Sequence, residues 1–251
     1  MNIHANQLTV SLETVRELLD AQFPEWRELA GRTRFATPEP VALGEPGADY
    51  PLPWSVQTWI PGDAASDEDP SGSVAFAHDL AAFIRGVRAI DTRGRTFRDE
   101  GRGGDLRAHD AWLETCFRRS EPLIDAARLR RAWQAMRDLP RAADDVMNHG
   151  DLIPGNVLVA DARLTGVIDV GGLGPADPAL DLVAAWHLLD DVPRQALRDD
   201  LGCDDLAWER GKAWAFQQAM GAVWYYVESN PAMSRMGRRT LARVMADAPA
   251  P

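Results

Sequence analysis

The chain has 251 residues, enough for one large domain or two small lobes with a real core. Hydrophobic residues make up 45% of it and charged residues 26%, as in an ordinary soluble globular protein. The formal net charge of -11 argues against a nucleic-acid partner, because phosphate backbones attract basic surfaces.

The sequence features that mark location point to the cytoplasm. No apolar run approaches the ~20 residues that a membrane span needs, so no membrane partner is expected. Residues 1–7 contain no basic stretch followed by an apolar core, so we predict no secretion signal. Cys116 and Cys203 match no metal or redox spacing, and they are most simply reduced thiols of a cytoplasmic protein.

The N-terminal quarter of the chain predicts one helix and little strand. Apolar residues recur at helical spacing from Ser11, a fair N-cap, to Phe23, just before Pro24. Residues 31–53 are rich in Gly and Pro, with one short candidate strand at Val41-Ala42-Leu43. Residues 54–60 alternate apolar and polar side chains, which predicts a strand that Pro61-Gly62-Asp63 ends.

The middle of the chain predicts helices. Asp69 and Pro70 have the residue types of an N-cap and a first helical position, so we expect a long helix to start there. A polar loop rich in Gly and Arg, residues 93–104, separates it from two further helical stretches, at residues 109–119 and 125–137.

The pattern then changes to two short β-like runs. Val157-Leu158-Val159 and residues 164–168 flank a turn at 161–163, which predicts a β-hairpin. After Pro178 the chain is helical again, with stretches predicted at 179–189, 194–201, 206–228 and 233–247.

Candidate catalytic residues surround this hairpin. The segment from His149 through Asp151 to Asn156 precedes it, and Asp169 follows it. Phosphoryl transfer needs a carboxylate that orients the attacking hydroxyl and accepts its proton, together with oxygen ligands that hold Mg²⁺ against the triphosphate. Asp151 followed five residues later by Asn156 supplies both on one loop, with the spacing of the protein-kinase catalytic loop. The hairpin returns the chain so that Asp169 can reach the same metal.

These motifs, with Asp177 and Asp181 in the run Asp177-Pro178-Ala179-Leu180-Asp181-Leu182, resemble the aminoglycoside phosphotransferase family. The resemblance is strong over about residues 145–190 and extends from Pro40 to the C-terminus, since Gly44-Glu45-Pro46, Trp54-Ser55-Val56 and Trp59 look like the family's hinge region. It implies a kinase-like fold and transfer of the γ-phosphoryl of ATP or GTP to a hydroxyl of a small molecule, often an antibiotic.

The same resemblance assigns roles to the residues. It implies that Asp151 is the catalytic Asp, that Asn156 and Asp169 hold Mg²⁺ and the nucleotide, and that His149 supports the catalytic loop. Asp181 would brace that loop from the next helix, with Asp177 beside it. Taken alone, Asp177 and Asp181 are more often helix N-cap residues.

Other conspicuous residues have simpler interpretations. His187 lies within an apolar stretch and is expected to be a core histidine with satisfied hydrogen bonds, and the nine tryptophans are mostly core groups rather than a substrate box. An acidic stretch is usually a solvated face; the resemblance leaves open that part of it lines the pocket of a cationic substrate. It consists of Asp190, Asp191, Asp199, Asp200, Asp204, Asp205 and Glu209.

The N-terminal region departs from the family pattern. A kinase-like N-terminal lobe needs about five strands and a helix, with a lysine for the α- and β-phosphates. The segment from Pro24 to Pro53 has only 30 residues, and the single lysine, Lys212, lies downstream of the whole catalytic loop. Arg32 or Arg34 is left as a replacement, although a guanidinium is larger. We therefore expect an internal deletion around residues 31–38.

The sequence thus predicts an α+β, protein-kinase-like fold, with a reduced N-terminal lobe and hinge in residues 1–60 and a mainly helical catalytic lobe in residues 61–251. Its function is expected to be Mg²⁺-dependent O-phosphotransfer from ATP or GTP to the alcohol group of a small hydroxylated molecule, with cations and antibiotics among the candidates. Two alternatives stay open: a degenerate family member that binds a ligand or partner, and a homodimer that restores the lobe.

Overall fold

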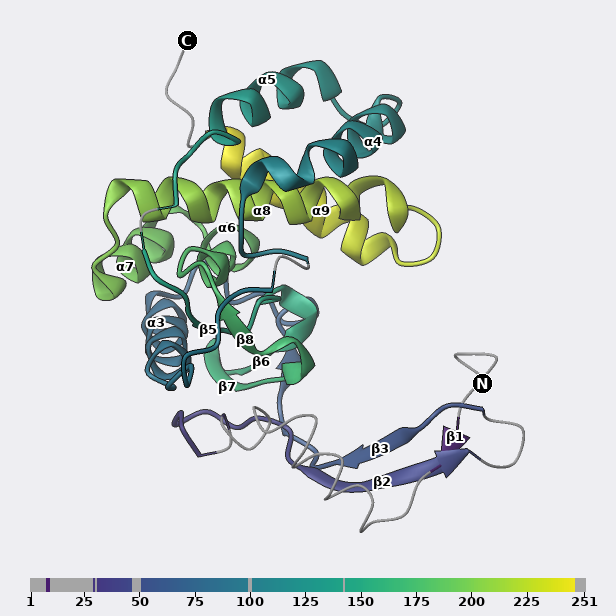
Figure 1. Cartoon of the computed structure of the whole chain (residues 1–251), viewed down its shortest axis with the longest axis vertical. Coiled ribbons are helices and arrows are strands. Elements are labelled where there is room, and N and C mark those ends of the chain that lie inside the picture. Colours follow the sequence, from purple (N-terminus) through teal and green to yellow (C-terminus); the bar gives the residue numbers. More distant parts are fainter. Residues whose placement is uncertain are drawn as a thin grey trace.

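The computed structural model describes residues 8–9, 29, 31–46, 51–98, 101–141 and 143–246. The helix predicted over residues 11–23 lies outside this part of the chain. Figure 1 shows a small N-terminal sheet that extends away from a larger, mainly helical body. The fold is therefore α+β, as the sequence predicts.

The N-terminal sheet consists of β1 (Leu8–Thr9), β2 (Pro40–Pro46) and β3 (Trp54–Gln57), antiparallel and in that order. Gly44 lies opposite Trp54, and a Cβ at Gly44 would come 1.9 Å from the indole, so only glycine lets the ring lie across β2. The predicted strand at 41–43 is longer than expected, and the one predicted over 54–60 ends at Gln57. All four side chains of β3 are exposed, so little packing extends it.

Residues 31–39 connect this sheet to the hairpin of the large lobe. The N–H of Ala36 donates to Thr165 O at 3.3 Å, and the N–H of Val167 donates to Ala36 O at 3.0 Å. A Cβ at Gly166 would meet Ile60 at 2.7 Å and Ala36 O at 2.9 Å, so glycine permits this close approach. The segment where the sequence predicts a deletion is thus held against the large lobe.

The first long helix, α3, spans Val74–Arg88. The sequence prediction placed its start at Asp69-Pro70, which is wrong because Ser73 is the N-cap and accepts a hydrogen bond from Phe76 N at 3.1 Å. The Asp69 carboxylate instead accepts the N–H of Ser71, which forms a turn ahead of the helix. The helices that follow match their predictions closely: α4 spans Asp110–Ser120 after the 3-10 turn η1 (Leu106–His109), and α5 spans Ala126–Met136.

The predicted hairpin is present as β6 (Val157–Ala160) and β7 (Arg163–Val167), with the two-residue β4 (Asp63–Ala64) paired to β6. Its turn residues Asp161 and Ala162 have φ of 53° and 54°, the left-handed values that two-residue hairpin turns require. A second antiparallel pair joins β5 (Val146–Asn148) to β8 (Gly174–Ala176).

The C-terminal half packs helices around a long central one. It contains η4 (Leu180–Val183), α6 (Ala184–Leu188), α7 (Asp191–Leu201), α8 (Asp205–Tyr225) and α9 (Pro231–Ala246). Figure 1 shows α8 crossing the lobe between α4 and α5 on one side and α6 on the other. Among the described residues, no helix is long and apolar enough to cross a membrane.

Candidate active site

The candidate catalytic loop runs from the end of β5 to the start of β6. Asn148 anchors its first turn, because its Nδ2 donates to Val146 O at 2.8 Å and to Ala176 O at 3.1 Å. Gly150 has φ of 82°, a left-handed value that costs glycine little. The loop ends in the 3-10 turn η2 (Pro154–Asn156), which leads directly into the hairpin.

His149 is fully buried and bonded on both ring nitrogens. Its Nδ1 lies 3.3 Å from the N–H of Asp151, and its Nε2 lies 3.1 Å from Ile168 O. Because one partner is a donor and the other an acceptor, these contacts assign the neutral tautomer with the proton on Nε2. His149 therefore ties the backbone of Asp151 to the residue that precedes Asp169.

Asp181, in η4, forms hydrogen bonds to the backbone of the same loop. Its two carboxylate oxygens accept the N–H groups of His149 and Gly150, each at 2.8 Å. Burial raises the pKa of Asp181 above its ordinary value, while the two N–H donors act in the opposite direction. The predicted contact of Asp181 with the loop is therefore present.

Asp177 lies elsewhere. It caps the turn before η4 by accepting the N–H of Ala179 at 2.9 Å, and it forms a buried ion pair with Arg210 at 2.5 Å. The expectation that Asp177 contacts the catalytic loop is wrong, because its carboxylate is taken up by α8 and by its own turn.

Asp151 and Asn156 are in direct contact. The Asn156 Nδ2 donates to both the backbone O and the Oδ2 of Asp151, each at 3.0 Å. Within the described part of the chain, this arrangement leaves the Asn156 Oδ1 with no hydrogen-bond donor. The amide therefore fixes the Asp151 carboxylate with one end and presents an oxygen with the other.

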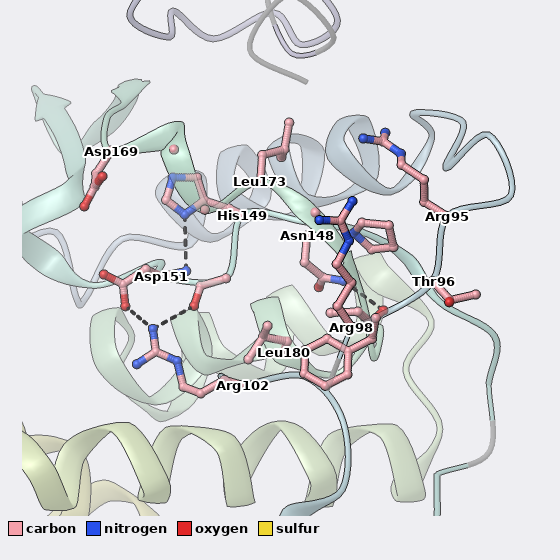
Figure 2. A pocket seen from close by; sticks show the side chains of 17 residues that line it. Arg95, Thr96, Arg98, Arg102, Asn148, His149, Asp151, Asp169, Leu173 and Leu180 are labelled. Carbon is pink, nitrogen blue, oxygen red and sulfur yellow. Dashed lines mark hydrogen bonds and ion pairs between the residues drawn. The ribbon is translucent and has the colours of Figure 1, made fainter. Parts of the chain in front are cut away.

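Asp169 follows the hairpin with an exposed side chain and a left-handed backbone, φ 59° and ψ 50°. Such a conformation costs energy in a residue other than glycine and is found disproportionately at functional sites. It begins the 3-10 turn η3 (Val170–Gly172). Figure 2 shows the carboxylates of Asp169 and Asp151 on the same side of the pocket.

The donor set of this site suits Mg²⁺ better than a transition metal. No group of three or more His, Cys, Asp or Glu side chains that could hold a metal occurs among the described residues. A nucleotide-bound Mg²⁺ needs fewer protein ligands, since it is bound through one or two carboxylate or amide oxygens plus substrate phosphates and waters. The open Asn156 Oδ1 and the exposed Asp169 carboxylate meet that requirement.

Arg102 is a site residue that the sequence analysis missed. Its Nη2 donates to Asp151 Oδ1 at 2.9 Å and to Gly150 O at 3.3 Å (Figure 2). The only sequence signal was the Arg-rich loop at 93–104, and nothing in its spacing singles out one arginine. Arg102 lines a cavity of about 840 Å³ with Arg95, Arg98, His149, Asp151 and Asp169.

A second cavity, of about 440 Å³, begins at the same Arg102–Asp151 pair and extends between α4, α8 and α9. We call it the helical-lobe pocket. Most of its wall is apolar or aromatic and consists of Trp112, Ile153, Tyr225, Tyr226, Met233 and Met236. Trp112 is thus an exception to the interpretation of the tryptophans as mostly core groups, because it is 42% exposed and lines this cavity.

His187 is the core histidine that the sequence predicts. Its Nδ1 lies 2.9 Å from Thr240 Oγ1 and its Nε2 lies 2.8 Å from Gln218 Oε1. Burial lowers the pKa of His187 to about 4, so the ring is neutral near pH 7. The Gln218 Nε2 donates in turn to Gly150 O at 3.3 Å, which links this buried network to the catalytic loop.

Lys212 and Arg34, two cations considered for binding the phosphates, are both paired with carboxylates. Lys212 is buried in α8, where it pairs with Glu209. Arg34, a candidate replacement, forms an ion pair with Asp79 of α3 at 2.5 Å, and Arg163 shares that carboxylate. Arg34 therefore connects the N-terminal segment to the large lobe.

Comparison with known proteins identifies the family of the chain. Residues 11–214 match the phosphotransferase enzyme family, so the chain belongs to this family. The aminoglycoside 3'-phosphotransferase of Streptomyces fradiae is 34% identical over 169 residues, which cover 62% of this chain and 60% of that protein. The viomycin phosphotransferase of Streptomyces vinaceus is 33% identical over 63% of this chain and 58% of its own length. The chain thus spans three-fifths or less of these curated relatives.

Solved structures confirm the fold. The GDP complex of aminoglycoside 2'-phosphotransferase-IIIa superposes with a TM-score of 0.64 at 17% identity, over 94% of this chain and 84% of that one. Macrolide 2'-phosphotransferase MphH from Brachybacterium faecium gives a TM-score of 0.55 at 20% identity, over 94% and 82%. The resemblance to kinase-like antibiotic phosphotransferases is therefore confirmed for family and fold.

Proposed function

We propose that the protein is an O-phosphotransferase that moves the γ-phosphoryl group of ATP or GTP to the hydroxyl of a small molecule. The observation that carries the proposal is the Asp151–Asn156 contact, because one amide both orients a carboxylate and leaves an oxygen open for a metal. Family membership supports the same reaction, and the names of the relatives make antibiotics the first acceptors to consider.

Asp151 acts on the acceptor hydroxyl. The carboxylate accepts its proton as the hydroxyl oxygen forms a bond to the γ-phosphorus, and the bond from that phosphorus to the β–γ bridging oxygen breaks. The products are a phosphate monoester and the nucleoside diphosphate. Both Asp151 oxygens are hydrogen-bonded, to Arg102 and Asn156, but each carboxylate oxygen has a second lone pair for the hydroxyl.

Asn156 Oδ1 and the Asp169 carboxylate would hold Mg²⁺. The ion, when bound, neutralises charge on the β- and γ-phosphate oxygens. His149 and Asp181 keep the loop in position, since together they bond three of its backbone N–H groups.

We further propose that the N-terminal lobe, ending near Ile60, is reduced. Its described sheet has only the strands β1–β3, and its second strand begins just after the segment bonded to the hairpin. An N-terminal lobe with so few strands should cover the nucleotide poorly and bind it weakly. The second candidate, a degenerate member that binds a ligand without catalysis, is favoured by one observation: Lys212 and Arg34 are both engaged in ion pairs, with Glu209 and Asp79.

Phosphoryl transfer is tested with the purified chain, Mg²⁺ and γ-labelled ATP or GTP against a panel of hydroxylated antibiotics and metabolites. Labelled phosphate monoester that disappears in the Asp151→Asn variant supports the enzyme. Full turnover by Asp151→Asn contradicts the assignment of Asp151. Acceptor binding by calorimetry without turnover in either nucleotide supports the degenerate binder.

A further inference from the structure

The helical-lobe pocket presents aromatic surface beside the candidate catalytic carboxylate. Trp112 and Tyr225 line it and are 42% and 61% exposed. The Trp112 ring lies over Gly221, where an added Cβ would come 3.3 Å from Cζ2. Tyr225 packs edge-on against Tyr226, with ring centroids 4.9 Å apart at 80°. Trp112 also packs against Trp224, with ring centroids 6.0 Å apart, so each exposed side chain has a ring beside it and the two form an aromatic wall.

The charge of this pocket is close to zero. Among the described residues that line it, only Arg102 and Asp151 are ionised, and they pair with each other at 2.9 Å. The remaining polar groups of the wall are the amides of Gln217 and Gln218. A polycation entering here would lose hydration of its amines without gaining carboxylate partners, which is costly.

The acidic stretch that could serve a cation lies at the other end of the lobe. It belongs to α7, the residue before it and the N-terminal part of α8, whereas Tyr225 is the last residue of α8. Gln217 lines the pocket and lies eight residues beyond Glu209, about 12 Å along the helix, and none of these acids lines the pocket. Figure 1 shows α7 and the α8–α9 connection on opposite sides of the lobe. The acids of this stretch therefore contribute no carboxylate to the helical-lobe pocket.

We propose that the phosphoryl acceptor is a hydroxylated molecule with a largely apolar or aromatic body and at most one positive charge, which packs on Tyr225 and Trp112 with its hydroxyl at Asp151. This inference rests on the proposed function at Asp151. The cavity size, about 440 Å³, is within the range of small-molecule sites. The acceptor thus differs in charge from the polycationic aminoglycosides that some relatives are named for.

Three hydroxylated probes test this proposal by calorimetry: phenyl β-glucoside, which is neutral; erythromycin, which carries one amine; and kanamycin, a polycation. We expect at least one of the first two to bind at least tenfold more tightly than kanamycin. Truncating an aromatic partner costs roughly twofold to tenfold in affinity, so Tyr225→Ala and Trp112→Ala should weaken that probe by this factor. The control Val192→Ala, 72% exposed on α7, should change nothing.

A shift of preference toward kanamycin in a variant would be the sharpest sign that the pocket is the acceptor site. Tyr225→Glu places a carboxylate in the wall and should strengthen kanamycin binding by up to roughly fivefold, the range of an exposed ion pair. Tighter binding of kanamycin than of both other probes by the unaltered chain, absence of binding by both up to millimolar concentration, or equal affinities in Tyr225→Ala and the parent overturns the proposal.

Turnover separates this proposal from the proposed function. If kanamycin alone is phosphorylated in the presence of Mg²⁺ and ATP or GTP, the enzyme assignment stands and the acceptor class is wrong. If a neutral or singly charged probe binds through Tyr225 and is never phosphorylated with either nucleotide, the pocket chemistry stands and the enzyme assignment is wrong.

Discussion

The candidate catalytic loop is buried or half-buried and hydrogen-bonded on several sides, whereas the N-terminal sheet exposes most of its described side chains. His149 is fully buried; Asp181 of η4 accepts its backbone N–H, and its ring bonds to Ile168 O just after the hairpin. Its neighbour Asn148 is bonded to Val146 of β5. In β3 every side chain is exposed, and Trp59 just beyond it is 90% exposed. Among the described residues, the large lobe therefore holds the candidate catalytic groups, while the N-terminal sheet contributes little packing of its own.

This separation has an energetic consequence. Buried polar groups that lose a partner cost about 1–3 kcal/mol each, whereas most surface substitutions change stability by less than about 0.5 kcal/mol. Substitutions around Asp151 should therefore affect rate or stability strongly, and substitutions in the N-terminal sheet should leave the large lobe folded. Four predictions test that contrast, from the largest effect to the smallest.

The largest effect is expected at the candidate base. Asp151→Asn keeps the shape of the side chain but cannot accept the proton, and a positioned general base contributes roughly 10²–10⁴-fold to rate. Steady-state kinetics should show that loss in kcat with an unchanged melting temperature. Asp161→Asn, in the exposed hairpin turn, is the matched control and should retain full activity.

The next effect is a pH dependence of stability that His187 causes. Its pKa is about 4 in the folded chain and about 6.5 when unfolded, so the unfolded state binds more protons between these values. Stability should therefore be fully present above about pH 6.5 and fall by up to about 3 kcal/mol as pH drops to about 4. Chemical denaturation across this range measures it. His187→Gln should flatten the curve; an unchanged slope would contradict the assignment.

A smaller loss of stability is expected when the Asp181 carboxylate, which accepts two N–H groups of the catalytic loop, is altered. Asp181→Asn replaces one carboxylate oxygen with an NH₂ group that faces a backbone N–H, which should destabilise the fold by roughly 1–3 kcal/mol. Denaturant midpoints give the difference. The Asp205 side chain is 97% exposed, so Asp205→Asn should shift the midpoint far less. Equal shifts in the two variants would show that Asp181 does not stabilise the catalytic loop.

The smallest effect is expected in the N-terminal sheet. Val56→Thr, at a side chain that is 42% exposed in β3, should change the free energy of unfolding by less than about 0.5 kcal/mol. The same substitution at Val159, fully buried in β6, leaves a hydroxyl without water and should cost roughly 1–3 kcal/mol. A loss at Val56 as large as that at Val159 would mean that the sheet is integral to the core.

The sequence predicted the regions where residue type and spacing are tied to local geometry. The Asp151–Asn156 loop, the hairpin and the helices after Pro178 were predicted close to where the structure has them. Asp181 was placed correctly because the family motif fixes it, whereas Asp177 was not, since Arg210 lies 33 residues away and no local pattern reveals that pair. The start of α3 was misplaced because Asp69 and Ser73 are both good caps and only packing chooses between them.

Contacts between distant segments escaped prediction. Arg102 reaches Asp151 across 49 residues, and Trp112 and Tyr225 line one cavity only because α4 packs beside α8. β5 and β8 are three residues each, too short for alternation to show, and they pair across 28 residues. Such features depend on the whole packed lobe rather than on the residues near them.

Calorimetric binding of ATP and GTP with Mg²⁺, in the parent chain and in Asp169→Asn, tests the central claim most directly. We predict measurable Mg²⁺-dependent binding that Asp169→Asn abolishes while its melting temperature is unchanged, because the metal site belongs to the large lobe. Absence of binding up to millimolar nucleotide, or equal binding by Asp169→Asn, would contradict the account and leave a family member with the chemical groups of a phosphotransferase but no working nucleotide site.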